Sequence, residues 1–224
     1  MEFCRLQGIR EEIANSGFPP DLAGDTIFCT GLSGKLIGRV PMPSALAREL
    51  PEQSCEMLQR CPQFLFDPVL ARAVERQGMT EVRYGVELVG CEQDDEGVTC
   101  SLRHAGGGTA EEVRARYVVG CDGPSSTVRK ILGIPFNGKD LGYALSAIVR
   151  VDLQHYHSFP RGERYLCIGP EGTWANFTTL DGHSLWRFSV VSSEGKLDDP
   201  ANFDMQSVLP VSYTHLTLPT ILRV

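Results

Sequence analysis

The chain has 224 residues, of which 42% are hydrophobic, enough for one large or two small globular domains. Its formal net charge is -7 and it has no block of Lys and Arg, which argues against a protein that binds nucleic acid through phosphate contacts. No apolar run approaches the ~20 residues of a membrane span and the start does not resemble a signal peptide, so we expect no membrane span and a cytoplasmic location.

The first part of the chain predicts a helix and then a long irregular segment. Residues 3–15 carry apolar side chains at three- and four-residue spacing, namely Phe3, Leu6, Ile9 and Ile13. Residues 18–62 are rich in Pro, Gly and Ser and show only two short strand patterns, at 26–29 and 35–40.

A second helix is better marked, over residues 66–78. Asp67 is its expected N-cap, Pro68 occupies the first helical position, and Gly78 follows the last turn. This pattern predicts a helix with well-defined ends.

The pattern then changes to the alternation typical of strands, over residues 82–88, 98–103 and 113–119. The last two segments flank a glycine-rich stretch and predict a hairpin. The glycines at 106–108 are interpreted as a turn, because a phosphate-binding loop would be followed by a helix.

After a short helix at 127–133, the chain again favours strands. Four such segments, joined by turns, cover 143–150, 164–169, 173–180 and 184–191. A succession of strands without helices indicates an antiparallel sheet, and we expect a second domain to begin near residue 138.

The stretch YVVGCDGPSSTVRK, residues 117–130, carries the chemistry. Its first residues read as a buried strand that ends at Asp122, between Gly120 and Gly123. A carboxylate at the end of such a strand suits the hydroxyls of a ribose or ribityl chain, and Ser125 or Ser126 can cap the following helix. Arg129 could reach a phosphate or brace Asp122, and the alternative is a plain Asx turn followed by a capped helix.

This stretch resembles the Asp-Gly motif of FAD-dependent aromatic hydroxylases of the para-hydroxybenzoate and phenol hydroxylase type. The matching residues are Val118, Val119, Gly120, Asp122, Gly123, Ser126, Val128 and Arg129. In that family the motif contacts FAD and the reduced pyridine nucleotide. The resemblance therefore implies that Gly120, Asp122, Gly123, Ser126 and Arg129 bind the cofactor.

Three other segments also resemble the family, around residues 1–9, 61–78 and 172–188. By position, Gln63 would be the glutamine that lies near the flavin; its alternative is a polar residue ahead of a helix. The family's first strand with its G-x-G-x-x-G turn, and its later Gly-Asp motif, have no counterpart here. The chain therefore resembles an internal fragment.

The resemblance implies an α/β fold: an incomplete FAD-binding Rossmann-like domain, with a parallel sheet and a β-hairpin extension, at 1–137, and part of an antiparallel-sheet substrate domain at 138–210. Residues 211–220 resemble a sequencing adapter translated in frame, so we expect 211–224 to be a non-native tail. The alternative for the tail is an ordinary amphipathic strand.

The implied activity is hydroxylation of a phenolic or other aromatic ring with FAD, NAD(P)H and O₂, and homo-oligomerisation is left open. The alternatives are a truncated, inactive chain that binds no flavin, and a flavin reductase or halogenase on the same scaffold. The residues identify no catalytic acid or base.

Three further features have structural interpretations that we favour. The eight cysteines lack a C-x-x-C pair and are expected to be reduced, and His155 and His157 lack a third metal ligand. The aromatic residues of the last strands are expected to pack the core, with a substrate cavity as the alternative; they are Trp174, Phe177, Trp186 and Phe188.

Overall fold

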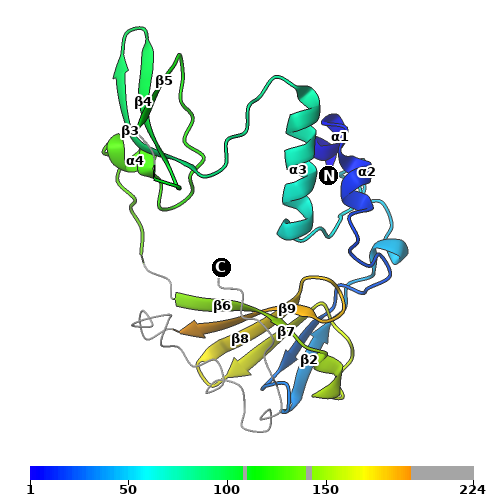
Figure 1. Ribbon diagram of the computed structural model, residues 1–224. Helices are drawn as coiled ribbons and strands as arrows, with labels where there is room; N and C mark the ends of the chain where they lie inside the picture. The colour runs from blue at the N-terminus through cyan, green and yellow to red at the C-terminus, as the bar shows by residue number, and fades with distance from the viewer. Residues whose placement is uncertain (108–109, 140–142, 193–224) are drawn as a thin grey trace. The chain divides into compact units, whose positions relative to one another are not determined.

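The computed structural model describes residues 1–107, 110–139 and 143–192, and they form two compact units (Figure 1). The sheet unit combines Met1–Arg76 with the described residues after position 142, and the hairpin unit runs from Gln77 to residue 139. These bounds differ from the expected division at residue 137, because strands from both expected domains pair in one sheet. The expected tail at 211–224 lies outside the described residues.

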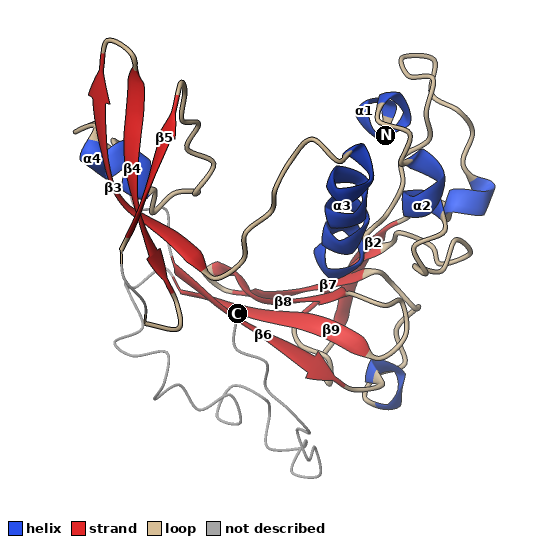
Figure 2. Ribbon diagram, turned by 45° about the horizontal axis from the view of Figure 1, so that its top comes forward, coloured by secondary structure: helices blue, strands red, loops and turns tan. Residues whose placement is uncertain are grey.

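The sheet unit is built on a six-stranded mixed sheet in the order β2-β1-β7-β8-β9-β6 (Figures 1 and 2). Its pairs are antiparallel except for the parallel pair of β1 and β7. The α/β class is therefore confirmed, as are the expected strands. They are β1 (Thr26–Cys29), β2 (Leu36–Val40), β6 (Tyr143–Arg150), β7 (Arg164–Gly169), β8 (Gly172–Thr179) and β9 (Leu185–Ser192).

One face of this sheet carries the main hydrophobic core. Side chains from five strands and from the 3₁₀ helix η2 (Leu153–His155) are buried there. Its largest members are aromatic: Tyr165 is fully buried, and the rings of Phe177 and Phe188 stack with their centroids 4.6 Å apart. The alternating pattern of the strands therefore has the expected cause, a sheet with one face buried in a core.

The opposite face, which we call the polar face, carries mostly polar residues at the remaining alternate positions. Because cross-strand partners share a face, the register aligns them in rows. One row is Thr26, Arg164, Thr178, Arg187 and Ile148, and the next is Phe28, Leu166, Asn176, Ser189 and Ser146.

Three helices pack together in the sheet unit, although the expected helix at 3–15 is two helices. These are α1 (Glu2–Leu6) and α2 (Arg10–Ala14), separated at Gly8, which has φ +69°. The break changes which side chains are buried: Ile9 and Ile13 pack against Val69, whereas Phe3 and Leu6 are exposed. The prediction of one continuous apolar face was therefore wrong.

The third helix, α3 (Gln63–Gln77), begins five residues before Pro68, the expected first helical position. The carbonyl of Pro62 accepts hydrogen bonds from the N–H groups of Leu65 and Phe66, which forms an additional first turn. Asp67 is therefore not the N-cap, and Pro68 lies inside the helix, where it removes one N–H donor. The expected end is confirmed, because Gly78 has φ +66°.

The hairpin unit contains a three-stranded antiparallel sheet, β3-β4-β5, with the short helix α4 against β3 (Figure 2). Its elements are β3 (Val86–Asp94), β4 (Gly97–His104), β5 (Glu111–Ala115) and α4 (Thr127–Ile131). The expected β4–β5 hairpin is confirmed, and the first strand begins at Val86 instead of residue 82.

The strand expected at 117–119 does not form. β5 ends at Ala115, and Tyr117 and Val119 are 80% and 81% exposed. A strand that is apolar on both faces needs neighbours that cover it. The described residues of this unit provide none.

Among the described residues, no helix is long and apolar enough to span a bilayer, and no group of three acidic, His or Cys side chains could hold a metal ion. All eight cysteines are free thiols. Cys29 and Cys167 are cross-strand partners in the core, and the neighbouring Cys29 sulfur, together with burial, raises the pKa of Cys167.

Candidate functional site

The Asp122 carboxylate caps the N-terminus of α4. It accepts hydrogen bonds from the Ser126 hydroxyl at 2.5 Å and from the N–H groups of Thr127 and Val128 at 2.6 and 3.2 Å. The Ser126 hydroxyl, followed by the backbone donors, lowers the pKa of Asp122. The structure therefore agrees in part with the alternative interpretation, in which Asp122 stabilises its own turn ahead of a capped helix.

The two glycines of the loop serve different purposes. Gly123 has φ +73°, which favours glycine, and no atom lies within 4 Å of the position where a Cβ would stand. A Cβ on Gly120 would lie 2.8 Å from the Cβ of Val128. Gly120 therefore allows close packing on α4, and Gly123 leaves the backbone beside Asp122 open to an approaching group.

Ser125 or Ser126 was expected to cap this helix, and the structure shows that Ser126 is the N-cap of α4. It is 9% exposed, and its hydroxyl accepts from the N–H of Arg129 at 3.0 Å while donating to Asp122. Together these two hydrogen bonds fix the Asp122 loop to the first turn of α4.

Arg129 does not brace Asp122 in the structure. Its guanidinium donates to the carbonyls of Ile134 at 3.0 Å and Pro124 at 3.4 Å, and lies 5.1 Å from the centroid of the Phe136 ring. Its buried Nε has no hydrogen-bond partner. Arg129 thus links the segments before and after α4, while Asp122 is held by other donors.

Gln63, the remaining predicted cofactor residue, is the first residue of α3 in the sheet unit. Its side chain is exposed. The structure therefore places it at the start of a helix, in a different unit from the Asp122 loop.

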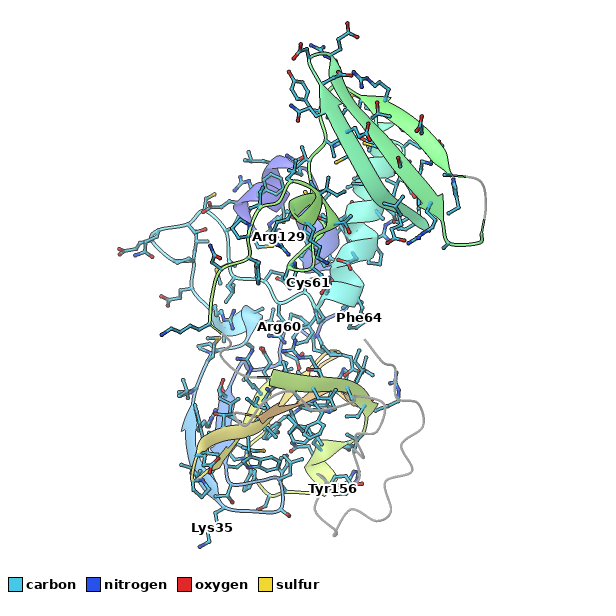
Figure 3. All side chains as sticks on the ribbon, turned by 90° about the vertical axis from the view of Figure 1, so that its left-hand side faces the viewer. Lys35, Arg60, Cys61, Phe64, Arg129 and Tyr156 are labelled. Atoms are coloured by element: carbon cyan, nitrogen blue, oxygen red, sulfur yellow. The ribbon has the colours of Figure 1, made fainter. Side chains whose placement is uncertain are left out.

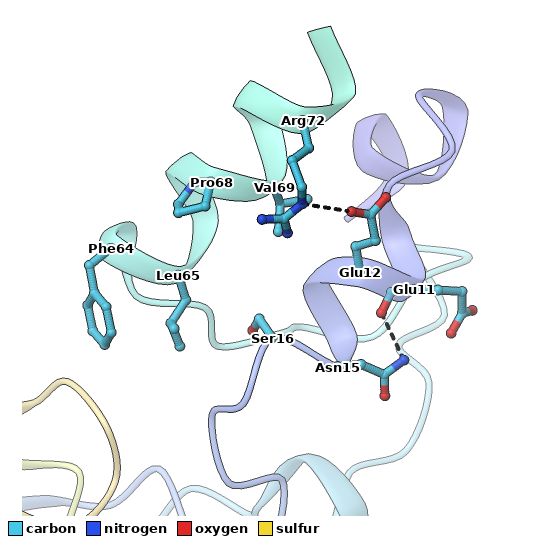
Figure 4. A pocket seen from close by; sticks show the side chains of 9 residues that line it. All are labelled: Glu11, Glu12, Asn15, Ser16, Phe64, Leu65, Pro68, Val69 and Arg72. Atoms are coloured by element: carbon cyan, nitrogen blue, oxygen red, sulfur yellow. Dashed lines mark hydrogen bonds and ion pairs between the residues drawn. The ribbon is translucent and has the colours of Figure 1, made fainter. Parts of the chain in front are cut away.

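A groove of about 550 Å³ lies between α2 and α3 (Figure 4). The side chains of Phe64 and Leu65 extend from the first turn of α3 along its apolar wall. The opposite wall is polar, where Glu12 forms an ion pair with Arg72 at 3.8 Å. Gln63 does not line the groove.

The segment before α3 is fixed to the sheet by Arg60, which is labelled with Phe64 in Figure 3. Its guanidinium forms an ion pair with Glu163 and donates to the carbonyl of Thr179, and it lies over the Phe18 ring at 5.7 Å. This contact set was not anticipated from the sequence, because its partners are far apart in the chain.

The aromatic residues of β8 and β9 pack the core, as favoured. Phe177, Trp186 and Phe188 are at most 5% exposed, and Trp174 packs against them from a partly buried position. His157 also stacks on the core, at 5.0 Å from Phe159 and 4.8 Å from Tyr165 between ring centroids. A metal role for this histidine has no support among the described residues.

Sequence reasoning missed the two arginines of the polar face, Arg164 and Arg187. In β9 the signal was available, since Arg187 stands between Trp186 and Phe188, which both point into the core. An arginine at such an alternate position must lie on the opposite face. Its proximity to Arg164 depends on register, which the sequence did not predict.

Comparison with known proteins supports the flavoprotein resemblance. The family described as "FAD binding domain" matches residues 1–207. The chain is 31% identical over 178 residues to a 2,4-dichlorophenol 6-monooxygenase of Delftia acidovorans, an alignment that covers 76% of this chain and 30% of that protein. It is 33% identical over 162 residues to aklavinone 12-hydroxylase DnrF of Streptomyces peucetius subsp. caesius, covering 68% and 32%.

Solved structures with the same fold include the rebeccamycin biosynthetic enzyme RebC with reduced flavin, with a TM-score of 0.76 and 28% identity. That match covers 87% of this chain and 37% of RebC. The flavin-dependent monooxygenase PieE in complex with FAD and substrate has a TM-score of 0.74 and 25% identity, covering 93% and 37%.

The chain thus spans about a third of the length of the curated relatives named here. The family match nevertheless extends over nearly all of the chain, including both described units. The chain belongs to the FAD-binding-domain family.

Proposed function

We propose that this chain is part of a flavin-dependent monooxygenase that hydroxylates an aromatic ring. The observation that carries the proposal is the family match over residues 1–207, which includes the complete Asp122 loop. FAD supplies the redox chemistry in such an enzyme, with NAD(P)H as electron donor and O₂ as the oxygen source. The relatives named as dichlorophenol, phenol and aklavinone hydroxylating enzymes favour a phenolic or polycyclic substrate.

In this proposal the hairpin unit contributes to the flavin site. Gly123 presents an open backbone, and Asp122 is exposed with two oxygens that share three internal donors. Since a carboxylate has about four acceptor positions, one remains for a ribityl or ribose hydroxyl. Ser126 and Arg129 hold this loop against α4, and Gln63 is assigned to the flavin from the sheet unit.

A second candidate is a chain without flavin affinity. The observation that favours it is the same set of hydrogen bonds, because Asp122 already has partners without any ligand. A reductase or halogenase on this scaffold would share these features and differ only in the products formed.

A titration of FAD into the purified chain, followed by flavin fluorescence, tests the proposal. We expect saturable binding that Asp122→Ala weakens by about tenfold, as for a lost hydrogen bond to a charged group. Asp95→Ala is the matched control, because Asp95 is an exposed aspartate of the same unit.

Equal affinities for the wild type and Asp122→Ala would contradict the role of the loop. No saturable binding to the wild type would favour the second candidate. If FAD binds, oxidation of NADH and NADPH with and without a phenol separates a hydroxylase from a simple reductase.

A further inference from the structure

Two cysteines of the hairpin unit stand opposite each other on neighbouring strands. Cys91 of β3 and Cys100 of β4 are direct cross-strand partners in the antiparallel register, and both are free thiols. Because cross-strand partners leave a sheet on the same face, the two side chains lie side by side. Within the described ranges the thiol hydrogen bonds belong to Cys29 and Cys61, so neither sulfur of this pair has a competing partner.

The pair occupies a non-hydrogen-bonded position of the β3–β4 ladder. Ala105, which directly follows β4, donates its N–H to the carbonyl of Gly85 on the β3 side at 2.8 Å. The direction of the backbone groups alternates along β4, since the register irregularity of this pair falls in β3, and Cys100 therefore does not bond to β3.

This position brings the two backbones to the separation that a disulfide needs. Partners at non-hydrogen-bonded positions have Cα atoms about 4.5 Å apart, and disulfides span Cα separations of about 4.4–6.8 Å. Rotation about the two Cα–Cβ bonds can therefore join the sulfurs while the strands stay in place.

The two thiols also differ in exposure. Cys91 is partly exposed on β3, an edge strand of the three-stranded sheet, whereas Cys100 is 7% exposed on the central strand. An oxidant from solvent can reach the Cys91 sulfur, and the sheltered Cys100 sulfur beside it can then react with the oxidised group. The pair thus contains an accessible thiol and a second thiol positioned to follow it.

A second cross-strand pair of cysteines provides a comparison within the same chain. Cys29 and Cys167 are partners on the parallel strands β1 and β7, and both are 0% exposed. Oxidation of these thiols requires the core to open first, because neither sulfur meets solvent. The exposure of Cys91 is therefore the feature that distinguishes the two pairs.

From these observations we propose that Cys91 and Cys100 form a reversible redox site, which a peroxide converts to a cross-strand disulfide. The Cys91 sulfur attacks the peroxide, the O–O bond breaks, and a sulfenic acid forms as water leaves. The Cys100 sulfur then displaces the sulfenic oxygen, which leaves as a second water while the S–S bond forms. Two thiols and one H₂O₂ thus give one disulfide and two waters, and a dithiol reverses the change by exchange.

The disulfide should act on the hairpin unit. It closes a loop through the β3–β4 turn and so restricts the opened form of the two strands. Opening of β3 and β4 should therefore become rarer in the oxidised chain. Because α4 packs against β3, the change lies beside the Asp122 loop, although the redox site itself needs neither flavin nor substrate.

Mass spectrometry of the full chain after treatment with H₂O₂ in the folded state tests the site. Residues 84–103 form one tryptic peptide that contains both cysteines of the pair and no methionine, whereas Cys29 and Cys167 lie in separate peptides. After alkylation in urea, we expect peptide 84–103 to have lost two hydrogen atoms and to carry no alkyl group. Dithiothreitol added before alkylation should restore both alkylation sites, and no peptide should join Cys29 to Cys167.

Cys91→Ser separates the redox site from a purely structural role of the two residues. In the wild type, oxidation should raise the hydrogen-exchange protection of β3 and β4 amides by about tenfold, and Cys91→Ser should show no such gain. Cys55→Ser is the matched control, because Cys55 is an exposed thiol of the sheet unit, and it should behave as the wild type.

Two outcomes would overturn the site. One is a peptide 84–103 that keeps both alkylation sites in wild-type chain whose Cys55 has been oxidised. The other is a Cys29–Cys167 cross-link that forms as readily as the Cys91–Cys100 disulfide, because exposure would then not distinguish the pairs.

Discussion

The two units of the chain differ in how their order is maintained. The sheet unit buries a continuous core, with Tyr165, Cys167 and Ala175 fully inaccessible. Among the described residues of the hairpin unit, the buried apolar side chains are Val98 and Cys100, and large side chains such as Tyr117 and Phe136 are exposed. The sheet unit therefore depends on apolar burial, whereas the Asp122 loop depends on its own hydrogen bonds.

This difference indicates what each unit can contribute to a site. A sheet with a packed core presents fixed positions, and this suits a substrate subsite. A hydrogen-bonded loop with an open glycine can form locally, which suits a cofactor contact that is completed by other parts of a protein. Substitutions in the two units should consequently differ in how much stability they remove and in how far through the chain their effects extend.

The largest expected effect comes from the core. Phe188→Ala removes a ring that is 1% exposed and stacked on Phe177, and should lower the free energy of unfolding by about 3–5 kcal/mol. Val119→Ala, at a position that is 81% exposed, should change it by no more than about 0.5 kcal/mol. Urea unfolding, followed by tryptophan fluorescence and by amide exchange, measures both variants. Similar losses of unfolding free energy in the two variants would contradict the contrast between the units.

A smaller and local effect is expected at Asp122. Asp122→Ala removes the acceptor for Ser126, Thr127 and Val128, so the first turn of α4 should open more often. Hydrogen exchange should show roughly tenfold less protection of the Thr127 and Val128 amides, with β8 amides unchanged. If protection is lost throughout the chain instead, the loop is not the local structure described here.

The smallest effect is a pH dependence in the sheet unit. Burial lowers the pKa of His157, whose Nδ1 accepts from the N–H of Phe159. The unfolded chain therefore binds more protons between this lowered pKa and the ordinary value of about 6.5. Stability should rise with pH through that window and gain nothing further above it.

Urea midpoints measured between pH 5 and 8 report this dependence. His157→Phe keeps an aromatic ring but cannot titrate, so its midpoint should vary less with pH below about 6.5 than the wild type's. Parallel curves for the two proteins would show that another group is responsible.

Local patterns predicted much of the fold. The strands β6 to β9 appeared where alternation placed them, because one face of each is buried in the core. The break at Gly8 was missed because spacing alone does not reveal a positive φ. The parallel pairing of β1 with β7 joins residues far apart in sequence, which no local pattern encodes.

The candidate site was predictable to the same extent. The motif identified Gly123 and Ser126 in the conformations that their residue types favour. It did not predict that the Arg129 guanidinium donates to backbone carbonyls instead of to Asp122. The sequence does not show which of these acceptors lies within reach of the guanidinium. The Cys91–Cys100 pair required the strand register, and so could be recognised only in three dimensions.

The parallel pair of β1 and β7 has a consequence for synthesis on the ribosome. β1 emerges more than one hundred residues before its partner β7, and the whole hairpin unit is made between them. β1 can pair with β2 at once, but its other edge must wait for β7 while the intervening segment is already free to fold. Exposure of nascent β1 and β2 to aggregation or to chaperones is expected to last until β7 has left the exit tunnel.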